Sequence, residues 1–261
     1  MPDTIAFLGT GLLGSGFIEA ALGRGETVTV WNRTRAKAEP LAARGARVAD
    51  TPADAVRGAA RVHLVLSDDD AVESVIDALR PGLASEAIIV DHTTTLPRRT
   101  AARAERLAAE GVRYLHCPVF ISPAAARQTQ GMILAAGPAD LFAAVEPALR
   151  RQAAEVRYLG ARPDVAAVHK LAGNAFNIGM VGLVADTLTL AKAEGVDGAE
   201  ILSLLEWFDS RKIVGGRGKL MLARNYAPSF ELGMAAKDLR LMQESAGELP
   251  LAMLPGLAAR M

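Results

Sequence analysis

A glycine-rich stretch near the amino end restricts the fold more than any other feature of the sequence. Gly9-Thr-Gly11-Leu-Leu-Gly14 follows the apolar run 4–8 and opens a segment in which Gly14, Ile18 and Leu22 share a helical face. In dinucleotide-binding βαβ units, such glycines permit a tight turn, let the backbone approach a pyrophosphate, and allow the helix to pack closely on the strand. The pyrophosphate binds at the helix N-terminus, where free N–H groups favour negative charge. The alternative is that these glycines serve only tight packing.

The first half of the chain repeats this alternation of strand and helix. Regular alternation predicts an α/β fold with a doubly wound, mostly parallel sheet of the Rossmann type, covered on both sides by helices. The candidate strands are 4–8, 27–31, 47–49, 62–66, 87–90, 114–115, 132–136 and 156–159.

The architecture changes after Gly160, where the strand signals stop. Pro163-Asp164 is typical of a helix start, and a helix over 164–194 would be roughly 45 Å long. Shorter helices are predicted near 198–207, 211–224 and 234–247, with breaks at Gly215-Gly216 and Asn225–Ser229. A chain of 261 residues exceeds the usual size of one domain. We therefore expect a cofactor domain over 1–162 and an all-helical C-terminal domain over 163–261, joined by the long helix.

Charge and composition point to a small partner molecule. The 29 basic and 29 acidic side chains balance, so no global field attracts nucleic acid or an anionic membrane. The single cysteine, Cys117, excludes an internal disulfide framework and fits a reducing compartment. Residues 1–20 carry neither a basic leader nor an apolar signal core, so a cytoplasmic location is expected.

The most apolar long stretch runs from Leu171 to Ala191. Asn174, Asn177 and Asp186 interrupt it, which makes it a poor bilayer span. We expect a buried helix and no membrane partner.

The end of the second predicted strand indicates which dinucleotide is bound. Proteins that prefer NAD(H) hold the ribose hydroxyls with an acidic residue at this position. The chain instead reads Trp31-Asn32-Arg33-Thr34-Arg35-Ala36-Lys37, in which guanidinium, hydroxyl and ammonium groups suit a 2′-phosphate. NADP(H) is therefore expected over NAD(H); the alternative is a solvated basic turn.

Two further segments carry candidate chemistry. Lys170 and Asn174 are four residues apart on the long helix, so they share one face, and a lysine in a cleft can supply a proton to a developing alkoxide. Thr93 and Thr94 follow a predicted central strand, where open parallel sheets bind ligands. The alternatives are a solvated lysine beside a capping amide, and threonines that cap the helix before Pro97.

Other polar residues have weaker patterns. Lys237-Asp238 forms a charged pair in the last predicted helix, for which an ion pair on an exposed face is the alternative. The four histidines show no zinc-ligand spacing, so no metal is expected. Asp68-Asp-Asp70 is expected to cap a helix, and Cys117 to be a buried, inert thiol.

Taken together, these motifs resemble the β-hydroxyacid dehydrogenases. This family contains 3-hydroxyisobutyrate dehydrogenase and the tartronate, glyoxylate and succinic semialdehyde reductases, with the related imine reductases, and shares a Rossmann domain like that of 6-phosphogluconate dehydrogenase. The glycine loop with Asn32-Arg-Thr34, the segment 91–97, Lys170 with Asn174, and Lys237-Asp238-Leu239 recur in the family order over nearly the whole chain. The resemblance implies a homodimer or homotetramer.

The resemblance also implies roles for individual residues. Lys170 resembles the catalytic lysine that protonates the carbonyl oxygen as hydride arrives, and Asn174 would assist it. Thr94 would lie near nicotinamide and substrate, and Lys237 would contact cofactor or substrate. The expected cofactor-binding residues are Gly9, Gly11, Leu12, Leu13, Gly14, Asn32, Arg33, Thr34, Lys37, Thr94 and Lys237, and the expected substrate-binding residues are Thr93, Thr94, Ser122, Lys170 and Asn174.

The sequence departs from the family at the expected substrate site. Where many members have Pro-Val-Ser-Gly-Gly to hold a substrate carboxylate, this chain has Pro118-Val-Phe-Ile-Ser122. Bulky apolar groups replace two small positions, which puts the usual hydroxy-acid substrate in doubt.

Three functions follow from these observations. The leading hypothesis is an NADP(H)-dependent oxidoreductase that transfers hydride between the cofactor and a small hydroxy acid, aldehyde or keto acid. The alternative within enzymes is an NADPH-dependent imine reductase, because Val30 to Lys37 and Pro40 to Gly45 resemble that branch. Lys170 argues against it, since an ammonium group repels an iminium ion. A non-catalytic dinucleotide-binding module is the third.

Overall fold

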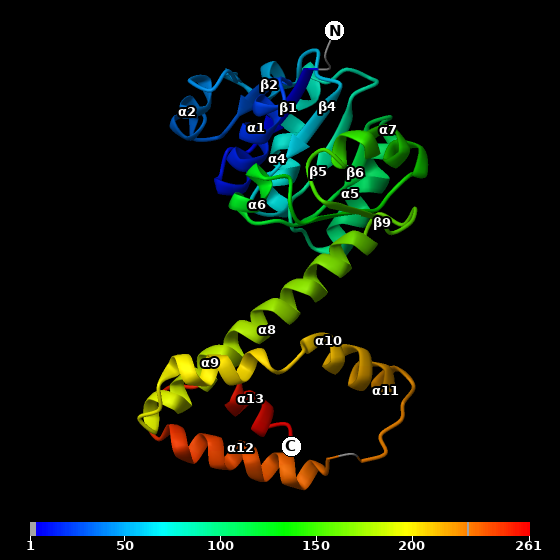
Figure 1. The fold of residues 1–261 in the computed structure, drawn as a ribbon. Helices are drawn as coiled ribbons and strands as arrows, with labels where there is room; N and C mark the ends of the chain where they lie inside the picture. Colours follow the sequence, from blue (N-terminus) through cyan, green and yellow to red (C-terminus); the bar gives the residue numbers. More distant parts are fainter. Residues whose placement is uncertain (1–3, 229) are drawn as a thin grey trace. The chain divides into compact units, whose positions relative to one another are not determined.

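Strand β1 (Thr4–Leu8) lies inside a six-stranded sheet with the order β3-β2-β1-β4-β5-β6 (Figure 1). Every neighbouring pair in this sheet is parallel. The chain reverses its direction of winding between β1 and β4, and this switch point is where open sheets bind ligands. The other strands are β2 (Thr27–Trp31), β3 (Arg47–Val48), β4 (Arg61–Leu64), β5 (Ile88–Asp91) and β6 (Arg113–His116).

The computed structural model describes residues 4–228 and 230–261. Its contacts divide the chain into two compact units, one ending at Gly173 and one running from Asn174 to Met261.

Both faces of the six-stranded sheet are covered, which explains why β1 is apolar at successive positions. Ile5 and Phe7 join one buried cluster, whereas Ala6 and Leu8 join another on the opposite face. The first cluster includes side chains of α1 (Leu12–Gly23), α2 (Glu39–Ala42), α6 (Pro123–Arg127) and α7 (Ala139–Leu149); the second includes side chains of α3 (Pro52–Val56), α4 (Asp69–Leu79) and α5 (Pro97–Ala109). Short 3-10 turns are η1 (Arg35–Lys37) and η2 (Arg80–Gly82). The predicted doubly wound fold is confirmed.

The last two predicted strands of the first half do not extend this sheet. β8 (Met132–Ala135) and β9 (Glu155–Tyr158) form a separate three-stranded sheet with β7 (Val119–Phe120), which pairs antiparallel with β8. Sequence patterns missed β7, because two residues after a proline are too short to show alternation.

The long helix α8 (Val165–Ala193) begins against the small sheet. Its buried Ala166 packs with Leu134 and Ala136, and Phe120 lies at the edge of the same cluster. The 29 residues of α8 confirm the predicted long helix.

The second unit contains only helices among its described residues. After the carboxyl part of α8 come α9 (Gly198–Glu206), α10 (Ser210–Ile213), η3 (Val214–Gly218), α11 (Lys219–Leu222), α12 (Leu232–Ala246) and α13 (Leu254–Ala258). The predicted break at Gly215-Gly216 is wrong, because the chain stays helical there with the wider π-type turn of η3. Of the predicted break at 225–229, Ser229 lies outside the described residues.

Asp186 ties the carboxyl end of the second unit to α8. Its buried carboxylate accepts hydrogen bonds from the backbone N–H groups of Ala252, Met253 and Leu254 at 2.6–2.8 Å. Burial acts to raise the pKa of Asp186, but these three donors outweigh it and leave the pKa below its ordinary value. The buried carboxylate of Asp186 therefore finds its hydrogen-bond donors within the same chain.

The expectation of a buried helix over 171–191 is wrong for the single chain. Ile178 and Val181 are each 70% exposed, and Phe176 is 46% exposed, because the other helices of the second unit leave much of this surface uncovered. By length and hydropathy alone, α8 is also the one helix of the described chain that could cross a membrane.

Candidate functional site

The glycine loop joins β1 to α1 in a conformation that its glycines require. Gly9 has φ +107°, and a Cβ there would lie 2.1 Å from the carbonyl oxygen of Val65. A Cβ on Gly14 would lie 2.1 Å from the carbonyl oxygen of Gly9. Both glycines are therefore fixed by the protein's own packing.

Gly11 has a different environment. A Cβ built on it would meet no protein atom within 4 Å, and it precedes the first turn of α1 without a side-chain cap. The N–H groups of that first turn, beginning with Leu12, have no acceptor within the helix and can bind an anion. The cradle is open where a pyrophosphate would approach the backbone, and it therefore fits a dinucleotide.

These residues line a cleft of about 700 Å³ within the first unit. Asn32 connects its two loops, because Asn32 Oδ1 accepts a hydrogen bond from Thr10 N at 3.0 Å and Asn32 Nδ2 donates one to Thr34 O at 2.9 Å. The cleft brings together nine of the residues that the sequence predicts for the cofactor: Gly9, Gly11, Leu12, Leu13, Gly14, Asn32, Arg33, Thr34 and Lys37.

The second half of the cleft wall was missed by sequence reasoning. It comes from the segment after β4 and the start of α4, across the switch point from the glycine loop. The signal was present, since ligands bind beyond the carboxyl ends of the strands at this point. These residues are Val65, Leu66, Ser67, Asp68, Asp70, Ala71, Ser74 and Val75.

Asp68 has a structural role in this wall. Its carboxylate accepts from Ala71 N at 2.9 Å and caps α4, as the sequence predicts. The backbone N–H of Ala71, the Ser67 hydroxyl and, more weakly, the charge of Arg33 hold the pKa of Asp68 below its ordinary value.

The loop after β5 is held at both ends by buried carboxylates. Asp91 Oδ1 accepts from Thr93 N, and Asp69 Oδ2 accepts from Leu96 N, each at 2.9 Å. Thr93 is buried, with its hydroxyl accepting from Leu66 N at 3.2 Å, whereas Thr94 is exposed. The alternative that these threonines cap the following helix is wrong, because Leu96 occupies the cap position of α5.

Arg103 neutralises both carboxylates from the core. Its side chain is fully buried, donates to Asp69 at 2.7 Å and to Glu73 at 2.8 Å, and lies 3.8 Å from Asp91. Tyr114 donates its hydroxyl proton to Asp91 at 2.7 Å, and burial raises the pKa of Tyr114 well above its ordinary value. One guanidinium therefore supports the whole loop that carries Thr93 and Thr94.

The histidines of the sheet are core residues. His63, His92 and His116 are buried, and His63 Nδ1 lies 3.0 Å from His92 Nε2. Burial lowers the pKa of all three, that of His92 to about 4, so they are neutral at pH 7. Cys117 is buried as well, and burial raises the pKa of its thiol. In the described part of the chain, no three metal-ligating side chains gather at one point.

Lys170 lies in the part of α8 that belongs to the first unit. It is half-buried, and burial lowers its pKa below the 10.5 of an ordinary lysine. Its Nζ lies 4.2 Å from the centre of the Phe120 ring. Asn174 follows one helical turn later, as the spacing predicts.

Two other predicted residues are engaged in local structure. Ser122 is the N-cap of α6, where its hydroxyl oxygen accepts from Ala125 N at 3.1 Å. Lys237, on α12 in the second unit, pairs with Asp238 at 2.8 Å, as the alternative interpretation of this pair expects. Their contacts with substrate or cofactor remain predictions.

Comparison with known proteins identifies the first half of the chain. Residues 4–160 match the sequence profile of a family described as the NAD binding domain of 6-phosphogluconate dehydrogenase. This match covers the six-stranded sheet, the glycine loop and the cleft.

Similarity to two curated proteins extends over almost the whole chain. An uncharacterized oxidoreductase, YfjR, of Bacillus subtilis is 29% identical over 95% of this chain and 90% of its own length. Glyoxylate/succinic semialdehyde reductase 1 of Arabidopsis thaliana is 30% identical over 95% of this chain and 88% of its own length.

A solved structure shares the fold of the whole chain. The reductive aminase from Aspergillus terreus, in complex with NADPH and ethyl-5-oxohexanoate, has a TM-score of 0.89 and is 27% identical, covering 99% of this chain and 92% of its own. The chain is thus similar in sequence to a protein named as a semialdehyde reductase and in fold to one named as a reductive aminase.

Proposed function

The chain belongs to the β-hydroxyacid dehydrogenase family, whose NAD-binding domain it shares over residues 4–160, and we propose that it is an NADP(H)-dependent reductase of small carbonyl compounds. Its substrate class is an aldehyde, a keto acid or the corresponding hydroxy acid. The observation that carries the proposal is the cleft in which the open glycine cradle and the basic end of β2 line one cavity.

Two groups of residues bind two different parts of the cofactor. The first turn of α1 holds the pyrophosphate, with Gly11 leaving room for it. Arg33, Thr34 and Lys37 hold the 2′-phosphate, because the end of β2 lacks the acidic residue that would bind free ribose hydroxyls. When bound, the nicotinamide supplies or accepts hydride at the carbonyl carbon.

Lys170 supplies the proton for this reaction. Its ammonium protonates the carbonyl oxygen during reduction, and its neutral amine accepts the proton during oxidation. The lowered pKa of Lys170 favours this exchange, because it brings the pKa closer to neutral pH. Asn174 orients the ammonium or the reacting oxygen, and Thr94 and Lys237 complete the contacts with cofactor and substrate.

An imine reductase is the second candidate, favoured by the similarity to the reductive aminase. Lys170 opposes it, because a neighbouring ammonium raises the energy of an iminium ion. The two candidates therefore make opposite predictions for the removal of this charge.

A substrate panel with two variants tests the proposal. NADPH oxidation is followed with semialdehydes, keto acids and cyclic imines, using the wild type, Lys170→Ala and Lys192→Ala. Lys192 is the matched control, an exposed lysine in the last turn of the same helix. We expect Lys170→Ala to lower the turnover of aldehydes about 100-fold or more and Lys192→Ala to leave it unchanged.

Two other outcomes would replace the proposal. Turnover of imines alone, surviving Lys170→Ala, would establish the second candidate. Tight NADPH binding without turnover of any substrate would indicate a non-catalytic dinucleotide-binding module.

We further propose that the chain works as a cytoplasmic homodimer, with residues 1–162 as the cofactor domain and 163–261 as the substrate and dimerisation domain. The exposed apolar side chains of α8, among them Phe176, Ile178 and Val181, support a second copy as the partner. A homotetramer would bury further surface in the same way.

A further inference from the structure

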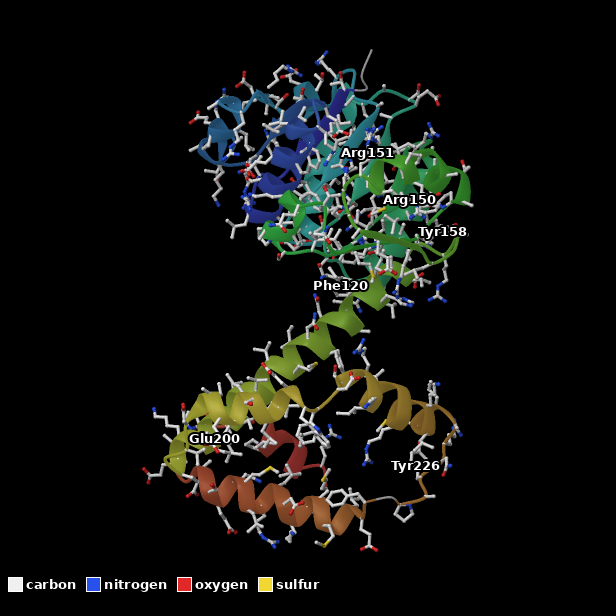
Figure 2. The ribbon with its side chains drawn as sticks, viewed as in Figure 1. Phe120, Arg150, Arg151, Tyr158, Glu200 and Tyr226 are labelled. Carbon is white, nitrogen blue, oxygen red and sulfur yellow. The ribbon has the colours of Figure 1, made fainter. Side chains whose placement is uncertain are left out.

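Phe120 forms a wall beside the proposed catalytic lysine. It ends β7, and its ring lies against the first turns of α8 (Figure 2). A Cβ on Gly173 would lie 2.3 Å from the ring carbon Cζ of Phe120, so the ring occupies the space that any larger residue would need. The absence of a side chain at Gly173 therefore allows the ring to pack directly on the backbone of α8.

The ring also packs against the small sheet and the start of α8. Phe120 packs against the buried cluster of Leu134, Ala136 and Ala166, which joins the small sheet to the start of α8. The half-buried ring is therefore in contact with the small sheet and with α8 at Gly173.

The ring also faces the charge of Lys170. Nζ lies 4.2 Å from the ring centre, within the range in which the negative face of an aromatic ring attracts a cation. Lys170 and Gly173 are three residues apart on one helix, so the ring lies across a single helical face. This side of the ammonium is covered by carbon.

The neighbouring residues reinforce the apolar character of the wall. Ile121 packs against the main core cluster, and the hydroxyl oxygen of Ser122 is taken up as the N-cap of α6. Because the ring lies in contact range of Nζ, a carboxylate cannot pair with the ammonium from this side without displacing the ring, and beside the ring it would lose water and meet the ring's negative face. An uncharged group would lose little water and gain apolar contact.

We infer that Phe120 determines substrate specificity by excluding a carboxylate beside the reacting carbonyl, so that the substrates are uncharged aldehydes or ketones. This inference rests on the proposed function and narrows its substrate class.

Matched ligands that differ only in charge test the inference. Short 2-keto acids are compared with their methyl esters in two measurements: kcat/KM with NADPH, and calorimetric binding to the protein saturated with NADP+. For the wild type we expect the ester to be favoured over the acid at least about 10-fold, which corresponds to about 1.4 kcal/mol.

Two variants assign the preference to Phe120. Phe120→Ser removes the wall and is expected to lower the ester-to-acid ratio about 10-fold or more. Phe120→Leu keeps an apolar side chain in the same place and is the control, with the ratio expected to stay within about 3-fold of the wild type.

The result that overturns the inference is separate from failure of the proposed function. Acid binding by the wild type as tight as ester binding, or an unchanged ratio in Phe120→Ser, would overturn it. If Phe120→Ser does not fold, the wild-type binding ratio still decides. The absence of all turnover would count against the proposed function, whereas the ratio of binding constants tests the Phe120 wall itself.

Discussion

Arg33 and Arg35 are two residues apart at the end of β2 but have different surroundings. Arg33 lines the cofactor cleft. Arg35 instead pairs with Glu39 and Asp50. The two arginines therefore form a matched pair for testing the preference for the 2′-phosphate.

Arg33→Ala should weaken the preference for NADPH over NADH about 10-fold or more, because a charge-assisted contact with the phosphate is lost. Arg35→Ala should leave the preference unchanged. Fluorescence titration of both cofactors with each variant gives the two ratios. Equal affinity of the wild type for NADPH and NADH would contradict the assignment.

At the scale of single residues, the sequence predicts the site residues whose place depends on backbone conformation or charge. The glycines, Asn32 and Arg33 lie together in the cleft because they follow β1 and β2, two parallel neighbours whose carboxyl ends lie at the same edge of the sheet. The sequence does not predict that Phe120 lies against Gly173 and Lys170, because that contact joins segments about 50 residues apart. Side-chain packing of this kind has no signature in a local pattern.

At the scale of elements, the loop between β5 and α5 depends on one buried cation. Arg103 lies on the same helix as Arg99, and both pair with acidic residues of α4. The Arg103 side chain is fully buried, whereas that of Arg99 is 40% exposed. Burial decides how much each pair contributes to stability.

Arg103→Met should destabilise the fold by about 3–5 kcal/mol, because it leaves Asp69 and Asp91 buried without their counter-charge. Arg99→Met should destabilise the fold much less, since water screens that pair. Urea unfolding of both variants measures the two free energies. A similar small loss for both would show that the loop does not depend on Arg103.

The buried histidines of β4, β5 and β6 make a prediction about acid stability. Burial lowers the pKa of His92 to about 4, whereas in the unfolded chain it lies near 6.5. Between these values the unfolded state binds the proton and the folded state does not, so stability present above pH 6.5 is lost as the pH falls toward 4.

Lowering the pH from 7.5 to 5 should therefore reduce the free energy of unfolding by about 2 kcal/mol through His92 alone. His63 and His116 act in the same direction, since burial lowers their pKa values too. Urea unfolding at the two pH values measures the loss. Equal stability at both pH values would mean that the histidines take up protons in the folded chain as readily as in the unfolded chain.

Sequence patterns predicted the helices better than their buried polar contacts. A cationic residue in a polar helix such as α5 is expected to be solvated, so Arg103 gave no signal of its position in the core. In the main sheet most neighbouring strands are consecutive in the chain, as short connections favour, whereas the step from β3 to β4 passes two strands. The small sheet could not be predicted in this way, because β7 depends on pairing with a distant strand.

At the scale of the whole molecule, the apolar surface of α8 is the feature that the single chain does not explain. The sequence predicted a buried helix from its composition, and composition cannot tell whether the covering surface belongs to the same chain. The proposed partner copy would account for this difference, because burying such a surface is the main driving force of association.

The double variant Ile178→Glu with Val181→Glu should shift the protein from dimer to a monomer of 27.4 kDa, because two carboxylates would be buried without partners. Lys192→Glu, a change at an exposed position of the same helix, should leave the dimer intact. Light scattering coupled to gel filtration measures both masses. A monomeric wild type would refute the proposed assembly.

The anchoring of Ala252, Met253 and Leu254 on Asp186 sets a rule for redesigning this protein. Because three consecutive amides bind one carboxylate, a residue inserted or deleted among Ala252, Met253 and Leu254 would break part of this contact. A peptide grafted at this position should therefore keep three consecutive backbone N–H groups opposite Asp186 and vary only the side chains.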